Sequence, residues 1–266
     1  MEAIADSAII IYQMGKVGST SIHRSLEHAD LTLPIYKVHF LSDEGMQHGE
    51  EFHQKTLKIP WEETPHIQTS QFLREQIQSN PAIQWKIITL VREPISREVS
   101  EFFQYVHSMY PELLDAEGNL DENKATRILQ TKLMFYNPEQ NYTCRWFDME
   151  MKGMFDIDVF AHPFNQKDGF TIIQQGNVDL LVLRLESLDQ TFGQAMTQFL
   201  GIETSIEMVR SNVRAEQKRG KTYQHVAKSL TIRESVCEKI YASRYAQHFY
   251  SPSEIEQFTQ KWTLTS

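Results

Sequence analysis

The segment 9–21 combines an apolar run with glycine, lysine and hydroxyl residues, which are residue types that can bind an anion. Ile9–Ile11 predicts a buried strand, 15–18 a loop, and 19–21 the start of an amphipathic helix. Glycine lets the backbone approach an anion closely, and the first N–H groups of the following helix point at it. The segment therefore predicts a phosphate cradle, with these anion-binding residues: Lys16, Gly18, Ser19, Thr20 and Ser21.

This loop differs from the loop that binds nucleoside triphosphates. The pattern G-x-x-x-x-G-K-[ST] places a hydroxyl residue directly after the lysine. Here Val17 and Gly18 follow Lys16 instead. The spacing thus favours a different anion, although the same four residues could form only a tight strand-to-helix connection with an exposed lysine.

A second strand-loop-helix unit carries another pair of candidate anion ligands. The apolar run 85–91 predicts a strand that ends at Arg92, and Pro94 suits the first turn of a helix. Ser100 then lies about two turns into that helix. A guanidinium and a hydroxyl could converge on one anion, or Ser100 could bond back to a helix carbonyl.

Together the two units resemble the signature elements of sulfotransferases that use 3′-phosphoadenosine 5′-phosphosulfate (PAPS). In that family the loop after the first strand holds the 5′-phosphosulfate. An arginine followed eight positions later by a serine, the spacing of Arg92 and Ser100, holds the 3′-phosphate. The resemblance implies PAPS as co-substrate, no metal, and in-line transfer of a sulfuryl group to a hydroxyl. Lys16 would then neutralise charge on the leaving phosphate.

Three stretches are similar to a bacterial family of capsular polysaccharide synthesis proteins. They are 13–19, 146–159 and 248–251. This similarity implies a saccharide or glycan intermediate as acceptor. It does not identify that acceptor.

A transferase of this kind needs a base, and His39 is the first candidate. It lies near the carboxyl end of a predicted strand, and an ordinary histidine is mostly neutral at pH 7. It resembles the strand-borne histidine base of some polysaccharide sulfotransferases. The alternative is a half-buried histidine bonded to backbone. Other superfamily members use a glutamate, so Glu150, Asp148 and Glu93 are further candidates, although Glu93 could simply form a surface ion pair with Arg97.

The charge balance excludes broad polyanion binding. A net charge of −9 and a pI of about 5.6 disfavour nucleic acid or a highly sulfated polymer as partner. A few local cations can still bind a small anion, and the late cluster Lys218-Arg219-Lys221 is a candidate beside Arg97. Related enzymes close a late basic loop over the 3′-phosphate, as 212–223 could here. A solvated surface loop is the alternative.

The order of elements predicts an α/β fold with a doubly wound, mainly parallel sheet. Strands are expected at 9–11, 35–41, 85–91 and 180–185, with a hairpin partner at 170–174. Helices are expected after the cradle and over 65–80, 95–106, 125–133 and 188–200, with a cap at Asp121 and a capping box at Ser251–Glu254. The P-loop-like unit and helical elaborations fit a single sulfotransferase-like domain over 1–266. Both anion loops fall at the carboxyl edge of the sheet, where ligands bind.

Compartment signals are few. Cys144 and Cys237 form no C-x-x-C pair, so neither a disulfide framework nor a zinc site is predicted. We expect no leader and no integral membrane segment, and hence a cytoplasmic protein. Oligomeric state stays open.

The sequence thus predicts a bacterial PAPS-dependent sulfotransferase acting on a saccharide or glycan hydroxyl. Two alternatives remain. The first is an ATP-dependent phosphotransferase, although neither a Walker-type loop nor an acidic metal pair is evident. The second is a non-catalytic capsule-assembly protein that binds nucleotide or glycan.

Overall fold

The computed structural model of this chain describes residues 4–64, 66–210 and 218–263, with the side chains of 218–221 excepted. The chain forms two compact units, each assembled from two separate stretches. The first contains Met1–Arg92 and Trp146–Ser211, and the second Glu93–Arg145 and Asn212–Ser266. A single domain over 1–266 therefore stays a prediction.

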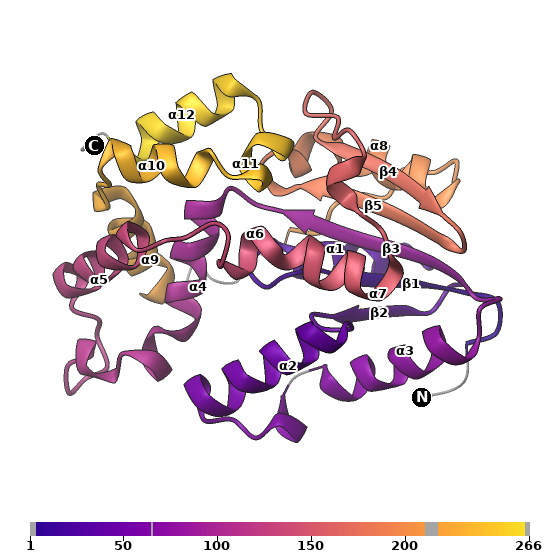
Figure 1. Cartoon of the computed structure of the whole chain (residues 1–266), viewed down its shortest axis with the longest axis horizontal. Helices are drawn as coiled ribbons and strands as arrows, with labels where there is room; N and C mark the ends of the chain where they lie inside the picture. The colour runs from indigo at the N-terminus through magenta and orange to yellow at the C-terminus, as the bar shows by residue number, and fades with distance from the viewer. Residues whose placement is uncertain (1–3, 65, 211–217, 264–266) are drawn as a thin grey trace. The chain divides into compact units, whose positions relative to one another are not determined.

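The first unit carries a five-stranded sheet in the order β2-β1-β3-β5-β4 (Figure 1). The strands are β1 Ser7–Tyr12, β2 Ile35–Val38, β3 Gln84–Val91, β4 Phe170–Gln175 and β5 Val178–Arg184. All neighbouring pairs are parallel except β4 with β5, which form an antiparallel hairpin. The predicted mainly parallel sheet and the return of β5 to it are confirmed.

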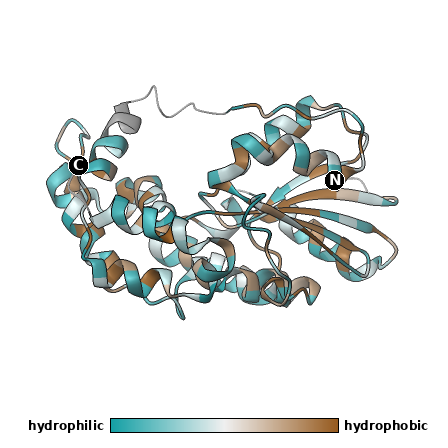
Figure 2. Ribbon diagram, turned by 90° about the horizontal axis from the view of Figure 1, so that it is seen from above, coloured by the Kyte–Doolittle hydropathy of each residue, from teal (hydrophilic) through white to brown (hydrophobic). Residues whose placement is uncertain are grey.

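Helices cover both faces of this sheet (Figure 2). The chain runs from β1 outward to β2 through α1 (Ser19–His28), then back past β1 to β3 through α3 (Ile67–Ser79). Because such crossovers are right-handed, the two helices lie on opposite faces. The sheet is thus doubly wound, and its topological switch point lies between the carboxyl ends of β1 and β3.

The sheet is apolar through its centre because both faces are covered. Ile9, Ile10 and Ile11 of β1 are fully buried, and the strands are coloured as hydrophobic in Figure 2. On the helix side, Ile22 and Leu26 of α1 are fully buried as predicted. Helix α8 (Leu188–Leu200) ends at a left-handed Gly201, also as predicted.

The remaining elements of the first unit are short. They are α2 Asp43–Glu51, the π-helical η1 Phe52–Leu57 and η4 Phe147–Lys152, α7 Gly153–Phe155, and the 3₁₀ turns η2 Trp61–Glu63, η5 Val159–Ala161 and η6 Leu185–Ser187. β2 ends at Val38 rather than at Leu41 as predicted. The N–H groups of Leu41 and Ser42 donate instead to the carboxylate of Glu150, at 3.1 and 2.9 Å.

The second unit is helical in its described residues. Its helices are α4 Pro94–Met109, η3 Pro111–Leu113, α5 Glu122–Met134, α9 Lys218–Ser229, α10 Glu234–Tyr241, α11 Arg244–Phe249 and α12 Pro252–Thr263, while α6 Tyr142–Trp146 runs across the boundary. Asp121 accepts from the Lys124 N–H at 3.0 Å, and Ser251 and Glu254 cap each other's N–H groups. Both predicted caps are confirmed.

Within the described ranges, the helices are too short or too polar to cross a membrane. Cys144 and Cys237 are both buried thiols. Burial raises the pKa of Cys237 to about 12. Neither thiol is therefore activated as a thiolate at neutral pH.

Candidate functional site

The loop between β1 and α1 has the backbone of an anion cradle. Lys16 and Gly18 both take left-handed conformations, with φ of 73° and 93°. A Cβ on Gly18 would lie 2.6 Å from Cδ1 of Leu185. Glycine therefore suits this position both for its positive φ and for its lack of a side chain. No side chain in the described part of the chain caps α1. The Ser21 N–H donates to the Gly18 carbonyl at 3.2 Å, and a helix start without a side-chain cap suits an anionic ligand.

Cationic side chains reach this loop from the neighbouring strands. Arg92, directly after β3, donates from Nη1 to the Lys16 carbonyl at 2.9 Å. Lys37 of β2 donates from Nζ to Oγ1 of Thr20 at 3.3 Å. Burial lowers the pKa of Lys37, which records its partial removal from water. The cradle thus collects positive charge at the switch point.

Lys37 is a site residue that the sequence analysis missed. A signal for it was present, because residues two apart in a strand share one face and Lys37 precedes His39 by two. Lys16 is half-buried, as are Ser21 and Arg92, while Ser19 is buried and Thr20 exposed. The predicted cradle residues therefore do lie together in the first unit.

His39 follows β2 and contacts the cradle loop. Its Nδ1 donates to the Gln13 carbonyl at 2.9 Å. That bond fixes the tautomer that leaves Nε2 as a proton acceptor. Burial lowers the pKa of His39 to about 4, against a raising effect of the Gln13 bond, so the ring is neutral at pH 7. The contact with backbone also fits the non-catalytic alternative, and the base role stays a prediction.

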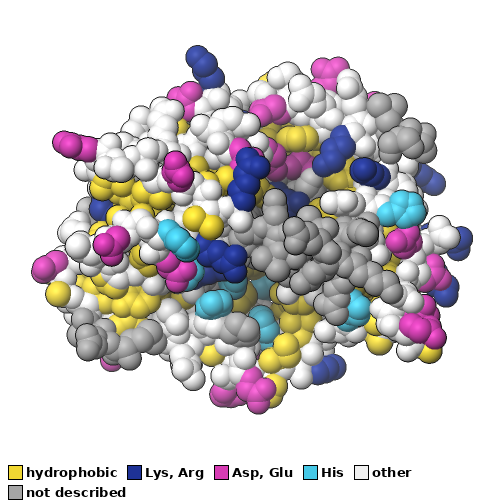
Figure 3. All heavy atoms as spheres, turned by 180° about the vertical axis from the view of Figure 1, so that it is seen from behind, with side chains coloured by type: hydrophobic (Ala, Val, Ile, Leu, Met, Phe, Trp, Pro, Cys, Tyr) yellow, Lys and Arg dark blue, Asp and Glu magenta, His cyan; other side chains and the backbone are white. Residues whose placement is uncertain are grey.

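A second histidine accompanies His39. His66 is exposed and occupies the N-cap position of α3, where it takes a left-handed conformation with φ of 69°. The centroid of its ring lies 5.7 Å from that of His39. Partial burial and the nearby charge of Lys37 lower its pKa. On the face drawn in Figure 3, several histidine side chains lie next to a lysine or arginine side chain. Sequence reasoning gave no signal for His66, because only the chain reversal before α3 brings it there.

Glu150 lies beneath the site and holds two of its strands. It is fully buried in η4, and its Oε2 accepts from the Tyr12 hydroxyl and from the N–H groups of Leu41 and Ser42. Gly45 leaves room for the other oxygen, since a Cβ there would lie 1.6 Å from Oε1. Desolvation raises the pKa of Glu150 to about 6, although these donors oppose the rise. These contacts make Glu150 a structural clamp, and its alternative role as the base stays a prediction.

The other two carboxylate candidates have different surroundings. Asp148 is half-buried on the same π-helical turn as Glu150. Glu93 is buried and caps α4, and its oxygens accept from the N–H groups of Ile95 and Ser96 at 2.7 and 2.8 Å. The Tyr241 hydroxyl and the Trp262 indole also donate to it. With four donors, Glu93 serves the fold of the second unit.

A surface ion pair between Glu93 and Arg97 is therefore wrong. Arg97 is 2% exposed and pairs with Glu98 and Glu101 at 3.1 and 2.7 Å. These two carboxylates raise the pKa of Arg97. A buried guanidinium must be paired, and Glu98 and Glu101 provide this pairing for Arg97.

Two predicted cofactor contacts cannot be placed beside the cradle. Ser100 is half-buried on α4, which belongs to the second unit. Its convergence with Arg92 stays a prediction. Lys218, Arg219 and Lys221 lie in the first turn of α9, but their side chains fall outside the described residues, as does the segment 212–217.

The fold and this site define an α/β protein with a lysine- and glycine-bearing loop at the switch point of its sheet. A family model described as "Putative capsular polysaccharide synthesis protein" matches residues 117–251, just over half of the chain. The chain belongs to this family, as expected. The match includes the predicted segments 146–159 and 248–251, and therefore Glu150.

Comparison with solved structures finds the mouse sulfotransferase SULT7A1 complexed with PAP, 3′-phosphoadenosine 5′-phosphate. The two are 13% identical with a TM-score of 0.35, over 97% of this chain and 84% of that chain. No curated protein matches the sequence. An activity for this chain is therefore inferred from its own residues.

Proposed function

We propose that this protein is a sulfotransferase that moves a sulfuryl group from PAPS to a hydroxyl of a saccharide or glycan intermediate. The observation that carries the proposal is the cradle itself. A left-handed Gly18, an uncapped α1 and the cations Lys16, Lys37 and Arg92 suit a small anion, and a neutral imidazole stands beside them. Membership in a capsule-synthesis family supports a carbohydrate acceptor.

Each group then has a defined task. His39 accepts the proton of the acceptor hydroxyl at Nε2, while the hydroxyl oxygen forms the new bond to sulfur and the bond from sulfur to the 5′-phosphate oxygen breaks. Lys16 and the N–H groups at the start of α1 neutralise the charge that develops on that leaving oxygen. Donors of this kind contribute about 3 kcal/mol each. Arg92 holds the Lys16 carbonyl and thereby fixes the loop.

A thermal-shift titration tests the donor. The ligands are PAP, 5′-AMP and Mg-ATP, each added to wild type and to Lys16→Asn. Asparagine tolerates the left-handed backbone at this position but carries no charge. Lys58→Asn is the matched control, because Lys58 is also left-handed, with φ of 58°. A ligand at 100 times its Kd adds about 2.7 kcal/mol to the free energy of unfolding.

We expect PAP to raise the midpoint by several degrees in wild type and Lys58→Asn, and much less in Lys16→Asn. Stabilisation by Mg-ATP without any by PAP would instead indicate a phosphotransferase. Silence from all three nucleotides would indicate a non-catalytic protein. Arg92→Ala is a poorer probe, since it also releases the Lys16 carbonyl.

A further inference from the structure

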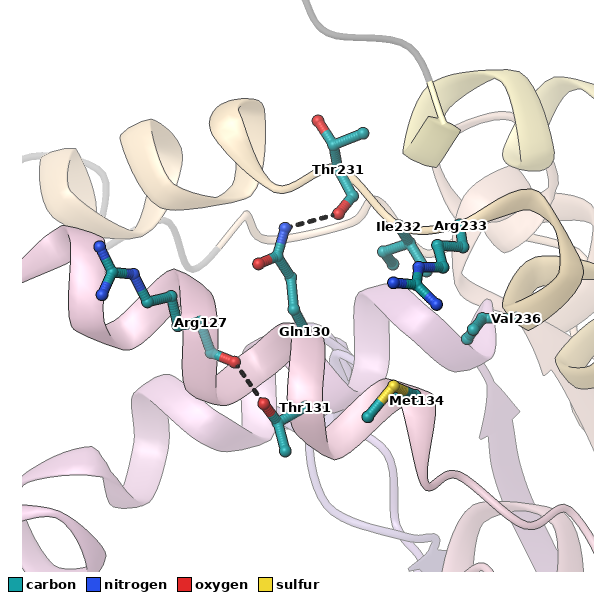
Figure 4. A pocket seen from close by; sticks show the side chains of 8 residues that line it. All are labelled: Arg127, Gln130, Thr131, Met134, Thr231, Ile232, Arg233 and Val236. Carbon is teal, nitrogen blue, oxygen red and sulfur yellow. Dashed lines mark hydrogen bonds between the residues drawn. The ribbon is translucent and has the colours of Figure 1, made fainter.

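The second unit contains a pocket that the proposed transfer reaction does not use. It has a volume of about 440 Å³ and lies between one side of α5 and the segment 231–236 (Figure 4). Arg127, Gln130 and Met134 line it from α5, and Ile232, Arg233 and Val236 from the facing segment. The Gln130 amide donates to the Thr231 carbonyl at 2.8 Å, which ties the two walls together.

Both walls of the pocket carry an arginine among their lining residues. Arg127 and Arg233 are exposed, and within the described residues neither forms an ion pair. By contrast, Arg97 of the same unit is buried against two glutamates. Two arginines without an ion pair at one pocket, in a chain of net charge −9, suit an anionic occupant. Guanidinium groups bind carboxylates with two parallel hydrogen bonds.

The pocket also offers apolar surface. Ile232 and Val236 are buried residues of its lining, while Met134 is 44% exposed. Ligand pockets combine apolar side chains with a few polar groups that fix the orientation of the ligand.

A sugar acid combines the two kinds of group that this surface can bind. Its carboxylate suits a guanidinium, and the C–H face of its ring suits apolar side chains such as Met134 and Val236. We propose that the pocket binds an acidic saccharide, a uronic-acid unit of the glycan acceptor. This proposal rests on the proposed function, whose acceptor class it narrows. All the lining residues fall inside the family-matched segment 117–251.

An acidic residue next to Arg233 should weaken the binding of an anion in this pocket. Glu234 follows Arg233 in the first turn of α10 and is exposed. Its charge opposes an anion at Arg233, so Glu234→Gln should tighten binding. A variant that improves binding cannot be explained by damage to the fold.

The test is an NMR titration of the full-length protein in 150 mM NaCl with three probes of similar length. Trigalacturonate is the acidic saccharide, maltotriose the neutral one, and triglutamate the acidic peptide. We expect trigalacturonate alone to shift the backbone signals of α5 and 231–236. Arg127→Ala and Arg233→Ala should each weaken it about tenfold, because a charge-assisted hydrogen bond is lost.

Arg24→Ala is the matched control, since Arg24 is an exposed arginine of the first unit. An equal loss in this variant would reveal unspecific attraction and overturn the proposal. Equal binding of triglutamate would point to an acidic peptide as the ligand. Equal binding of maltotriose would show that the guanidinium groups do not select a carboxylate. Either result overturns the proposal. The PAP titration of wild type reports separately on the proposed function, because the nucleotide is expected at the loop between β1 and α1, whose residues do not line this pocket.

Discussion

At the scale of single residues, Glu150 shows how a buried carboxylate can organise the strand ends around a candidate site. Its Oε2 binds the last residue of β1 and the turn that follows His39. These contacts fix the two strand ends that carry the cradle and the histidine. The cost is a carboxylate removed from water, which its raised pKa records.

Glu150→Gln should change how stability depends on pH. The native pKa of about 6 lies above the ordinary value of 4.5, so the native state holds this proton more tightly than the unfolded state does. That stabilisation is complete below pH 4.5 and lost as the pH rises through 6. The free energy of unfolding of wild type relative to the variant should therefore fall by about 2 kcal/mol from pH 4 to pH 7.

Urea denaturation at several pH values measures this difference. Glu62→Gln, which removes an exposed glutamate of the same unit, is the control for the loss of one carboxylate. A wild-type to Glu150→Gln difference that stays constant over this range would show that Glu150 does not titrate there.

At the scale of elements, the start of α1 depends on backbone conformation more than on side chains. Gly18 supplies the left-handed N-cap, and the approach of Leu185 leaves no room for a Cβ. Helix α4 begins in the opposite way, since the carboxylate of Glu93 caps it. A capping side chain accepts hydrogen bonds from the first N–H groups of a helix, whereas glycine has no side chain to do so and a ligand can take that place.

Gly18→Ala should weaken nucleotide binding while the protein remains folded. The positive φ alone costs an alanine about 1 kcal/mol, and the contact with Leu185 adds to it. Any shift of the loop moves the N–H groups that the anion needs. We expect PAP affinity to fall at least tenfold, as measured by the same thermal-shift titration.

Gly176→Ala is the comparison, because Gly176 also has a positive φ, of 58°, but no atom within 4 Å of its Cβ position. It should lose stability and keep PAP affinity. Equal PAP binding by wild type and Gly18→Ala would mean that the cradle does not hold this nucleotide.

At the scale of the whole molecule, each unit is built from two stretches that are distant in sequence. The family-matched segment 117–251 therefore cuts through both units. It lacks β1, β2 and β3 of the sheet, and it lacks α4 and α12 of the second unit.

Expressed alone, residues 117–251 should not fold. Without β3, β5 has no parallel neighbour in the sheet, and a two-stranded hairpin is marginal in water. We expect no cooperative thermal transition by near-ultraviolet circular dichroism, whereas the full chain shows one or more. A cooperative transition in the fragment would show that the segment is an independent domain.

Much of the fold follows from local patterns in the sequence. The apolar strand runs, the hairpin at Gly176, the Gly201 stop and the caps at Asp121 and Ser251 were all predictable, because each depends on residues close in sequence. The loop 15–18 between β1 and α1 was predictable for the same reason, while its role as an anion cradle stays a prediction. The end of β2 was not, since a carboxylate more than a hundred residues away captures the N–H groups of Leu41 and Ser42.

The sequence by itself determined the residue types of the anion site and the edge of the sheet on which they fall, because strand polarity and helix starts are local properties. Only the tertiary structure decided which groups surround them. Lys37 and His66 join the site through strand pairing and a chain reversal, while Arg97 and Glu93 are removed from it by burial among partners in the second unit. Such neighbours are long-range contacts, and no local pattern encodes them.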